Sequence, residues 1–169
     1  RGGTLRAAKT LAKAIAAGSI HIGFPAEVVF AHIDDPIYSR EDFDDLRRRQ
    51  IKVRTFKFQT VDSSAVEQMF ELIATGVKVA HGEYSLLRDG AKDFLDCDAW
   101  IFAADRIPHP LVPLRPYFVF AHDYIQRYLP ELFGDHYERN IIQNARRAAG
   151  VLVSTDHTRM DAINYAGLP

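Results

Sequence analysis

The sequence has few of the features that mark secreted, membrane-spanning or nucleic-acid-binding proteins. Its single cysteine, Cys97, excludes an internal disulfide and a cysteine-rich zinc site, and it fits a reducing compartment. No apolar run approaches the roughly 20 residues that a transmembrane helix needs, and no signal peptide is visible. The net charge of −1 lacks the basic excess typical of nucleic-acid binders. We therefore expect a cytoplasmic protein without a nucleic-acid partner.

The titratable residues also lack the pattern of a metal site. Apart from His122, discussed below, the histidines show no metal-ligand spacing, and no carboxylate-rich metal motif is present. There is no internal repeat and no low-complexity tract. We therefore expect neither a metal nor a bound cofactor.

The 169 residues, 47% hydrophobic and 25% charged, suit one globular domain with a hydrophobic core. Helical spacing alternates with short apolar runs. Strands are predicted at 27–33, 51–58, 77–80, 84–87, 99–103, 117–121 and 151–153. Helices are predicted at 4–17, around 43–46, from 64 to about 76, at 90–95, 130–133 and 135–149, and from 156 to 165. Capping is predicted for Ser39 with Asp42, Ser64 with Glu67, and 154–156. The strand 151–153 is expected to be buried, and Met160 and Ile163 are expected to face inward on the last helix. This alternation predicts an α/β fold, a Rossmann-like three-layer sandwich on a mainly parallel sheet.

The run Tyr117–Ala121 is the most informative of these strands, because polar residues follow it directly. Five apolar residues without alternation suit a strand buried on both faces. His122 and Asp123 then stand at its carboxyl end, where open parallel sheets bind their ligands. The alternative is structural: Asp123 caps the next turn and His122 is a satisfied, half-buried histidine.

The opening residues are a second candidate site. Gly2 and Gly3 precede a predicted helix, and such an arrangement lets a ligand approach the backbone and directs free N–H groups toward an anion. A plain turn is the alternative. Because the chain opens on Arg1 and stops at Pro169 just after a helix, we expect a piece of a longer protein, with a strand missing upstream and a domain missing downstream.

Several segments, taken in order, resemble the N-terminal Rossmann-like domain of retaining GT-B glycosyltransferases of the family 4 type. They are Gly2-Gly3-Thr4, Phe118–Asp123, Pro130-Glu131, Arg146–Gly150, Val151–Thr155 and Ala166–Leu168. The resemblance is dense only between residues 117 and 168. Residues 20–116 depart from the pattern, which leaves the acceptor open.

The resemblance implies a function. A domain of this kind supplies the acceptor side of a cleft and one wall of the site for a nucleotide-sugar donor. A second Rossmann domain beyond Pro169 would carry most of the donor contacts. The activity would be transfer of the sugar to a hydroxyl acceptor with retention, in bacterial polysaccharide or glycan biosynthesis. Some acceptors of such enzymes are lipid-linked, which would bring peripheral contact with the inner face of the membrane.

The resemblance also implies roles for individual residues. His122 would face the donor sugar, and Gly2, Gly3 and Thr4 would approach the donor phosphates. Asp123 is a candidate acceptor contact, although its position varies in such families. The residues themselves suggest two further acceptor contacts: Arg106, in a proline-rich loop at a strand end, and Arg159, for which a solvated helix position is the alternative.

Two other functions remain open at this point. One is a nucleotide-sugar epimerase of the same fold, which would use carboxylates and a histidine for acid–base chemistry. The other is a non-catalytic α/β module that binds a small ligand or a partner protein, since folds of this kind host many functions. If the chain is a transferase domain, residues 1–169 alone should be inactive, because half of the cleft would be missing.

Overall fold

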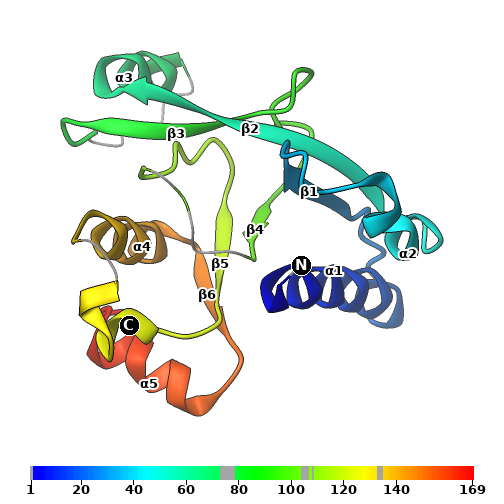
Figure 1. The fold of residues 1–169 in the computed structure, drawn as a ribbon. Coiled ribbons are helices and arrows are strands. Elements are labelled where there is room, and N and C mark those ends of the chain that lie inside the picture. The colour runs from blue at the N-terminus through cyan, green and yellow to red at the C-terminus, as the bar shows by residue number, and fades with distance from the viewer. Residues whose placement is uncertain (1, 73–78, 104–106, 108, 133–134) are drawn as a thin grey trace. The chain divides into compact units, whose positions relative to one another are not determined.

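The computed structural model describes residues 2–72, 79–103, 107, 109–132 and 135–169 (Figure 1). The helices are α1 Gly3–His21, α2 Asp44–Arg47, α3 Ser63–Leu72, α4 Asp135–Arg147 and α5 Asp156–Asn164, with short 3₁₀ helices η1 Arg40–Phe43, η2 Ile125–Arg127 and η3 Pro130–Leu132. The strands are β1 Val29–Ile33, β2 Lys52–Asp62, β3 Glu83–Arg88, β4 Trp100–Phe102, β5 Tyr117–Ala121 and β6 Gly150–Val153.

The described strands form two three-stranded sheets. One is parallel, in the order β4-β5-β6, with Trp100 opposite Tyr117 and Ala121 opposite Val153. The other is mixed, in the order β1-β2-β3, and its β1–β2 pair is parallel. The predicted α/β class is confirmed. The single, mainly parallel sheet is not what the described residues form, because apolar runs locate strands but do not say which strands pair.

The chain divides into two compact units. Unit 1 comprises Arg1–Phe58 with Leu87–Phe94, and unit 2 comprises Gln59–Leu86 with Leu95–Pro169. The core of unit 1 gathers side chains from α1, β1 and the η1–α2 turn: Ala12, Phe30, Phe43, Leu46 and Ile51. In unit 2, one cluster lies around β5 and α5, and it is made of Ala121, Tyr124, Ala145, Ala162, Ala166 and Leu168. Another is made of Val66, Phe70, Tyr84, Leu86 and Val112.

Strand β5 lies where its sequence predicted, but only one of its faces is fully buried. Tyr117, Val119 and Ala121 are buried, while Phe118 and Phe120 on the opposite face are half-buried. Its neighbour β6 differs from the expectation of a fully buried strand, because Leu152 is exposed. The central strand of the parallel sheet thus places His122 and Asp123 directly after a well-packed element.

Helix boundaries were harder to predict than strands. Helix α1 continues through Gly18 to His21, since one glycine costs only about 1 kcal/mol in a helix. The predicted helix at 90–95 is instead a turn in which the Asp89 carboxylate accepts three backbone N–H bonds, from Ala91, Lys92 and Asp93. Helix α3 is capped by Asp62 rather than Ser64, because the Asp62 carboxylate accepts from the Ala65 N–H.

The structure confirms one predicted helix cap and differs from the predicted inward face of α5. The reciprocal box at Ser39 and Asp42 is confirmed, with the Ser39 N–H donating to the Asp42 carboxylate over 2.8 Å. On α5, Met160 and Ile163 were expected to face inward, but both are exposed, and Thr158, Asp161 and Ala162 are buried instead. The predicted strand at 77–80 falls partly outside the described residues, and residues 79–80 are not in a strand.

Candidate functional site

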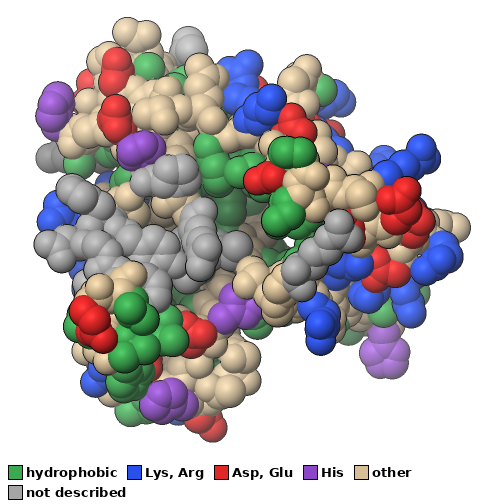
Figure 2. Space-filling model, in the orientation of Figure 1, with side chains coloured by type: hydrophobic (Ala, Val, Ile, Leu, Met, Phe, Trp, Pro, Cys, Tyr) green, Lys and Arg blue, Asp and Glu red, His purple; other side chains and the backbone are tan. Residues whose placement is uncertain are grey.

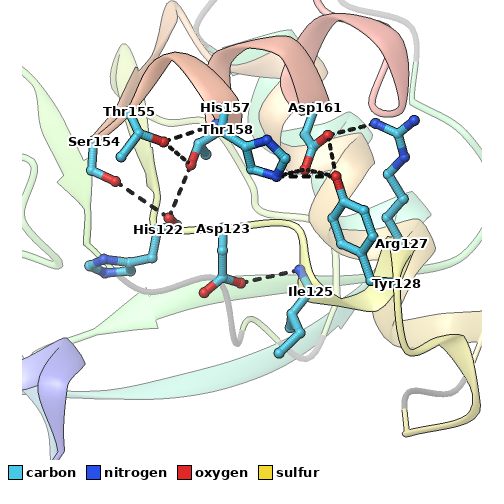
Figure 3. A network of polar contacts seen from close by, with 10 residues as sticks. All are labelled: His122, Asp123, Ile125, Arg127, Tyr128, Ser154, Thr155, His157, Thr158 and Asp161. Atoms are coloured by element: carbon cyan, nitrogen blue, oxygen red, sulfur yellow. Dashed lines mark hydrogen bonds and ion pairs between the residues drawn. The ribbon is translucent and has the colours of Figure 1, made fainter.

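The candidate site lies in unit 2, at the edge where the three parallel strands end. Strands β4, β5 and β6 finish at Phe102, Ala121 and Val153. Because they are parallel, the residues that follow them gather at one edge: Ala103, then His122 with Asp123, then Ser154 with Thr155. Figure 3 shows His122, Asp123 and the residues of α5 around them.

The imidazole of His122 is oriented by a backbone carbonyl at the end of the neighbouring strand. Its Nε2 lies 2.9 Å from the carbonyl oxygen of Ala103. A carbonyl only accepts hydrogen bonds, so Nε2 carries the proton and, in the neutral ring, Nδ1 holds the lone pair. The ring is half-buried and packs edge-to-face against Phe120, with centroids 4.6 Å apart. With Nε2 held by the Ala103 carbonyl, Nδ1 is the ring nitrogen that would contact a ligand hydroxyl.

Two hydroxyls from the start of α5 hold the backbone of His122. The Thr158 hydroxyl lies 3.4 Å and the Ser154 hydroxyl 3.5 Å from the His122 carbonyl oxygen. Thr155 caps α5, and its Oγ1 accepts from the Thr158 N–H over 3.1 Å. Of the residues predicted to cap this helix, Thr155 does so, whereas the Ser154 hydroxyl contacts the His122 carbonyl at the end of β5.

Asp123 has the turn-capping contact named above as its alternative. Its Oδ1 accepts from the Ile125 N–H over 3.2 Å, and the residue is exposed. It also lines a pocket of about 220 Å³ between the segment after β5 and α5. The pocket is lined by Asp123, Tyr124, Ile125, Tyr128, His157, Thr158 and Asp161.

A buried carboxylate, Asp161, lies in this pocket and was not predicted. It is only 3% exposed. Arg127 approaches one carboxylate oxygen to 2.5 Å, and the Tyr128 hydroxyl donates to the carboxylate at 2.9 and 3.0 Å from its two oxygens. A buried carboxylate needs such partners to remain charged. The contact partners are 33 or 34 residues apart in the chain, so no local spacing could have revealed them.

The same network shifts the ionisation of Tyr128 and involves His157. The hydrogen bond to Asp161 raises the pKa of Tyr128, because the phenol must stay protonated to donate it. The His157 ring stacks on the Tyr128 ring, with centroids 5.9 Å apart and planes at 23°. The His157 Nε2 lies 3.2 Å from the Tyr128 hydroxyl. The pocket thus combines an aromatic pair with oriented polar groups.

Of the two predicted arginine contacts, only Arg159 is described by the structure, and it is not among the residues that line this pocket. Arg159 is exposed on α5, where its Nε lies 3.3 Å from the Asp156 carboxylate, so its solvated alternative describes it better. Arg106 lies outside the described residues.

The predicted anion-binding residues Gly2, Gly3 and Thr4 are exposed at the start of α1 in unit 1. Gly2 is extended, no side chain caps the helix, and its first turn holds no acidic residue. The first N–H groups of α1 thus have no side-chain cap. A Cβ built on Gly2 or Gly3 would meet no atom within 4 Å, so neither glycine is required by packing.

A pocket of about 240 Å³ adjoins this helix start. It is lined by Gly2, Leu5, Arg6, Lys9, Thr10, Lys13, Asp42 and Asp45. Two of its cations, Lys9 and Lys13, are already paired with Asp45. This pocket belongs to unit 1, whereas His122 belongs to unit 2. A groove shared by the diglycine and His122 therefore remains a prediction.

The described residues were also considered as ligands of a metal ion and as membrane-spanning helices. In the described ranges, no group of three or more histidine, cysteine, aspartate or glutamate side chains is arranged to hold a metal ion. Over the same ranges, no helix combines the length and apolar character that crossing a bilayer requires.

No protein-family model matches this chain, and neither a curated protein nor a solved structure does. The functional interpretation therefore depends on the residues and on the geometry described above.

Proposed function

We propose that this chain is the acceptor-side domain of a retaining glycosyltransferase of the GT-B type, acting on a nucleotide-sugar donor and a hydroxyl acceptor. The observation that carries the proposal is the placement of His122. It follows the central strand of a parallel sheet, its ring is oriented by the Ala103 carbonyl, and its backbone is held from α5. The order of sequence segments that resembles this family supports the same function.

The chemistry expected of such an enzyme matches what these residues can do. Glycosyl transfer with retention passes through an oxocarbenium-like state, as glycoside hydrolysis does. His122, with Nε2 committed to a carbonyl, would accept a hydrogen bond from a sugar hydroxyl at Nδ1 and so orient the donor sugar. The leaving phosphate would take the acceptor proton, so no protein nucleophile is needed.

Helix α1 would act on the leaving group. Its uncapped N–H groups, beside Gly2 and Gly3, are suited to stabilise the negative charge that develops on a phosphate. Both glycines leave open space around their α-carbons, which would let the diphosphate approach the backbone.

A transferase is favoured over an epimerase by the surroundings of His122. In the described part of the chain, the hydrogen bond of its imidazole runs to a backbone carbonyl rather than to a carboxylate. Epimerase chemistry of the kind considered above would pair the histidine with carboxylates.

The test is nucleotide-sugar turnover, measured on the full-length protein. Release of nucleoside diphosphate is followed for a panel of nucleotide sugars, with product anomers assigned by NMR. We expect His122→Ala to lower turnover by about 100-fold or more, the size typical of losing an oriented polar contact in the transition state. The exposed His21, outside both pockets, supplies the control His21→Ala, which should leave turnover unchanged.

The outcomes separate the hypotheses. Wild-type turnover in His122→Ala would remove His122 from the site. If the wild-type protein turns over none of the nucleotide sugars, the proposal fails and a non-catalytic binding module becomes the better interpretation.

A further inference from the structure

Several polar and charged side chains line the pocket that includes Asp123 and Asp161. The negative charge of Asp161 is compensated inside the pocket, because Arg127 forms an ion pair with its carboxylate and the Tyr128 hydroxyl donates a hydrogen bond to it. Two exposed polar side chains also line the pocket: Asp123, which uses one carboxylate oxygen in its turn, and His157, whose Nε2 lies 3.2 Å from the Tyr128 hydroxyl. A carboxylate at the mouth disfavours anionic ligands and accepts hydrogen bonds from hydroxyl groups.

The pocket also offers a flat apolar surface. Tyr128 and His157 are stacked, and Ile125 lines the wall near Asp123. Small-molecule sites typically combine apolar walls with a few well-placed polar groups. At about 220 Å³, the pocket has the size of one sugar ring rather than of a nucleotide. These features together suit an uncharged, polyhydroxylated ring.

An exposed apolar surface begins at the mouth of the same pocket. Four apolar residues of the η2–η3 segment follow helical spacing and are 38–67% exposed: Ile125, Tyr128, Leu129 and Leu132. Figure 2 shows hydrophobic side chains gathered over this segment, at the lower left. Contiguous exposed apolar residues of this kind often mark a binding surface. Because Ile125 and Tyr128 line both the pocket and the stripe, one ligand could occupy both.

We propose that this pocket and stripe bind the acceptor, and that the acceptor is a lipid-linked sugar: an uncharged sugar ring in the pocket, with its apolar chain over Ile125, Leu129 and Leu132. The inference rests on the proposed transferase function and adds the class of acceptor. The polar pocket accounts for the ring, and the continuous apolar surface accounts for the chain. A free, fully polar sugar would leave the stripe without a role.

Alkyl glycosides below their micelle concentration provide the probes. Binding of n-octyl and methyl glucosides, galactosides and mannosides is measured by titration calorimetry on the full-length protein. For the hexose that binds, we expect the octyl glycoside to bind at least about tenfold more tightly than the methyl glycoside, since each buried methylene contributes about 0.8 kcal/mol.

Variants then separate the two parts of the site. The double variant Leu129→Ser/Leu132→Ser should weaken octyl glycoside binding about tenfold and leave methyl glycoside binding unchanged, because it removes only apolar contact area. Tyr128→Phe should weaken both probes, because it keeps the ring but removes the hydroxyl that orders Asp161. The matched control Met160→Ser/Ile163→Ser changes two exposed apolar residues of α5 outside the pocket, and it should alter neither affinity.

The inference is overturned if no octyl glycoside binds, if octyl and methyl glycosides bind equally, or if the control variant weakens binding as much as the stripe variant. Its failure is distinct from failure of the proposed function. Donor hydrolysis that persists without alkyl glycoside binding would remove the acceptor assignment alone. Absence of donor turnover in the wild-type protein would remove the transferase.

Discussion

At the scale of single residues, Asp45 forms ion pairs with two lysines that lower the pKa of its carboxyl group. Asp45 of α2 lies between two lysines of α1, with Lys9 Nζ 2.5 Å from one carboxylate oxygen and Lys13 Nζ 3.1 Å from the other. Desolvation alone would raise the pKa of Asp45, but the hydrogen bonds and charges of the two lysines lower it below its ordinary value of 3.8. These pairs connect the first helix of unit 1 to its second.

This arrangement predicts an acid-dependent contribution to stability. A carboxyl whose pKa is lower in the folded state stabilises the fold above its unfolded-state pKa, and the contribution is lost as pH falls through the folded-state pKa. Asp45→Asn should therefore lower the free energy of unfolding at neutral pH by about 1 kcal/mol or less, since the group is partly exposed. Urea titrations of both proteins at neutral and at strongly acidic pH measure the difference.

The difference should shrink on acidification. Glu27→Gln, which breaks a much more exposed pair with Lys52, is the control and should change stability less. A deficit in Asp45→Asn that stays constant down to acid pH would show that the ion pairs are not its cause.

The candidate site shows how far residue types alone can be interpreted. His122 could be selected from the sequence because it follows an apolar run, and a strand end is a place defined by local pattern. Asp161 could not, because a lone aspartate within a helix is ordinarily solvated and its partners Arg127 and Tyr128 are distant in the chain. The buried network at this site is a product of tertiary structure.

At the scale of elements, two hydrogen bonds of Asn144 connect α4 to neighbouring segments. The Asn144 Oδ1 accepts from the Leu111 N–H over 2.9 Å, and the Asn144 carbonyl accepts from the Tyr117 hydroxyl over 2.8 Å. Asn144 is almost completely buried. Helix α4 is thereby joined both to the loop that precedes β5 and to β5 itself.

Removing the amide should loosen this connection. Asn144→Ala leaves the buried Leu111 N–H without its partner, and an unsatisfied buried donor costs about 1–3 kcal/mol. We expect a loss of stability of that size in urea unfolding, together with faster hydrogen exchange at Leu111. The exposed Asn164 supplies the control Asn164→Ala, which should lie close to wild type. Unchanged protection at Leu111 in Asn144→Ala would contradict the assignment.

Secondary structure was predictable where a single local signal dominated. The apolar run of β5 and the capping box at Ser39 are such signals, and both are confirmed. At residues 90–95 the sequence resembles a short helix, but the Asp89 carboxylate binds the N–H groups that would start it and a turn results. Competition between side chains and the backbone for the same donors decided that segment.

At the scale of the whole molecule, pairing between distant strands was the least predictable feature. The sequence predicts alternating strands and helices, and hence the α/β class, which is confirmed. The local sequence pattern does not show which strands share a sheet. Strands β3 and β4 follow one another along the chain, yet they belong to different sheets. Alternation indicates that strands exist, whereas the sheet that each one joins depends on contacts across the fold.

Global stability should respond to alkaline pH through Tyr117. This tyrosine is buried in the parallel sheet, and desolvation raises its pKa to about 12 from an ordinary value of 10.0. A group whose folded-state pKa is raised contributes stability that is complete below the unfolded-state pKa and is lost as pH rises through the folded-state pKa. Between pH 10 and about 12, the wild-type protein should therefore lose roughly 2–3 kcal/mol through this residue.

Tyr117→Phe isolates this contribution. At neutral pH the variant should be about 1 kcal/mol less stable, because the hydrogen bond to the Asn144 carbonyl is gone. Above pH 10 it should lose less stability than the wild type, so the two curves of unfolding free energy against pH converge. Fluorescence of Trp100, the sole tryptophan and the strand partner of Tyr117, follows urea unfolding at each pH. Parallel curves from neutral pH to pH 12 would mean that Tyr117 ionises in the folded protein as readily as in the unfolded chain, contrary to its burial.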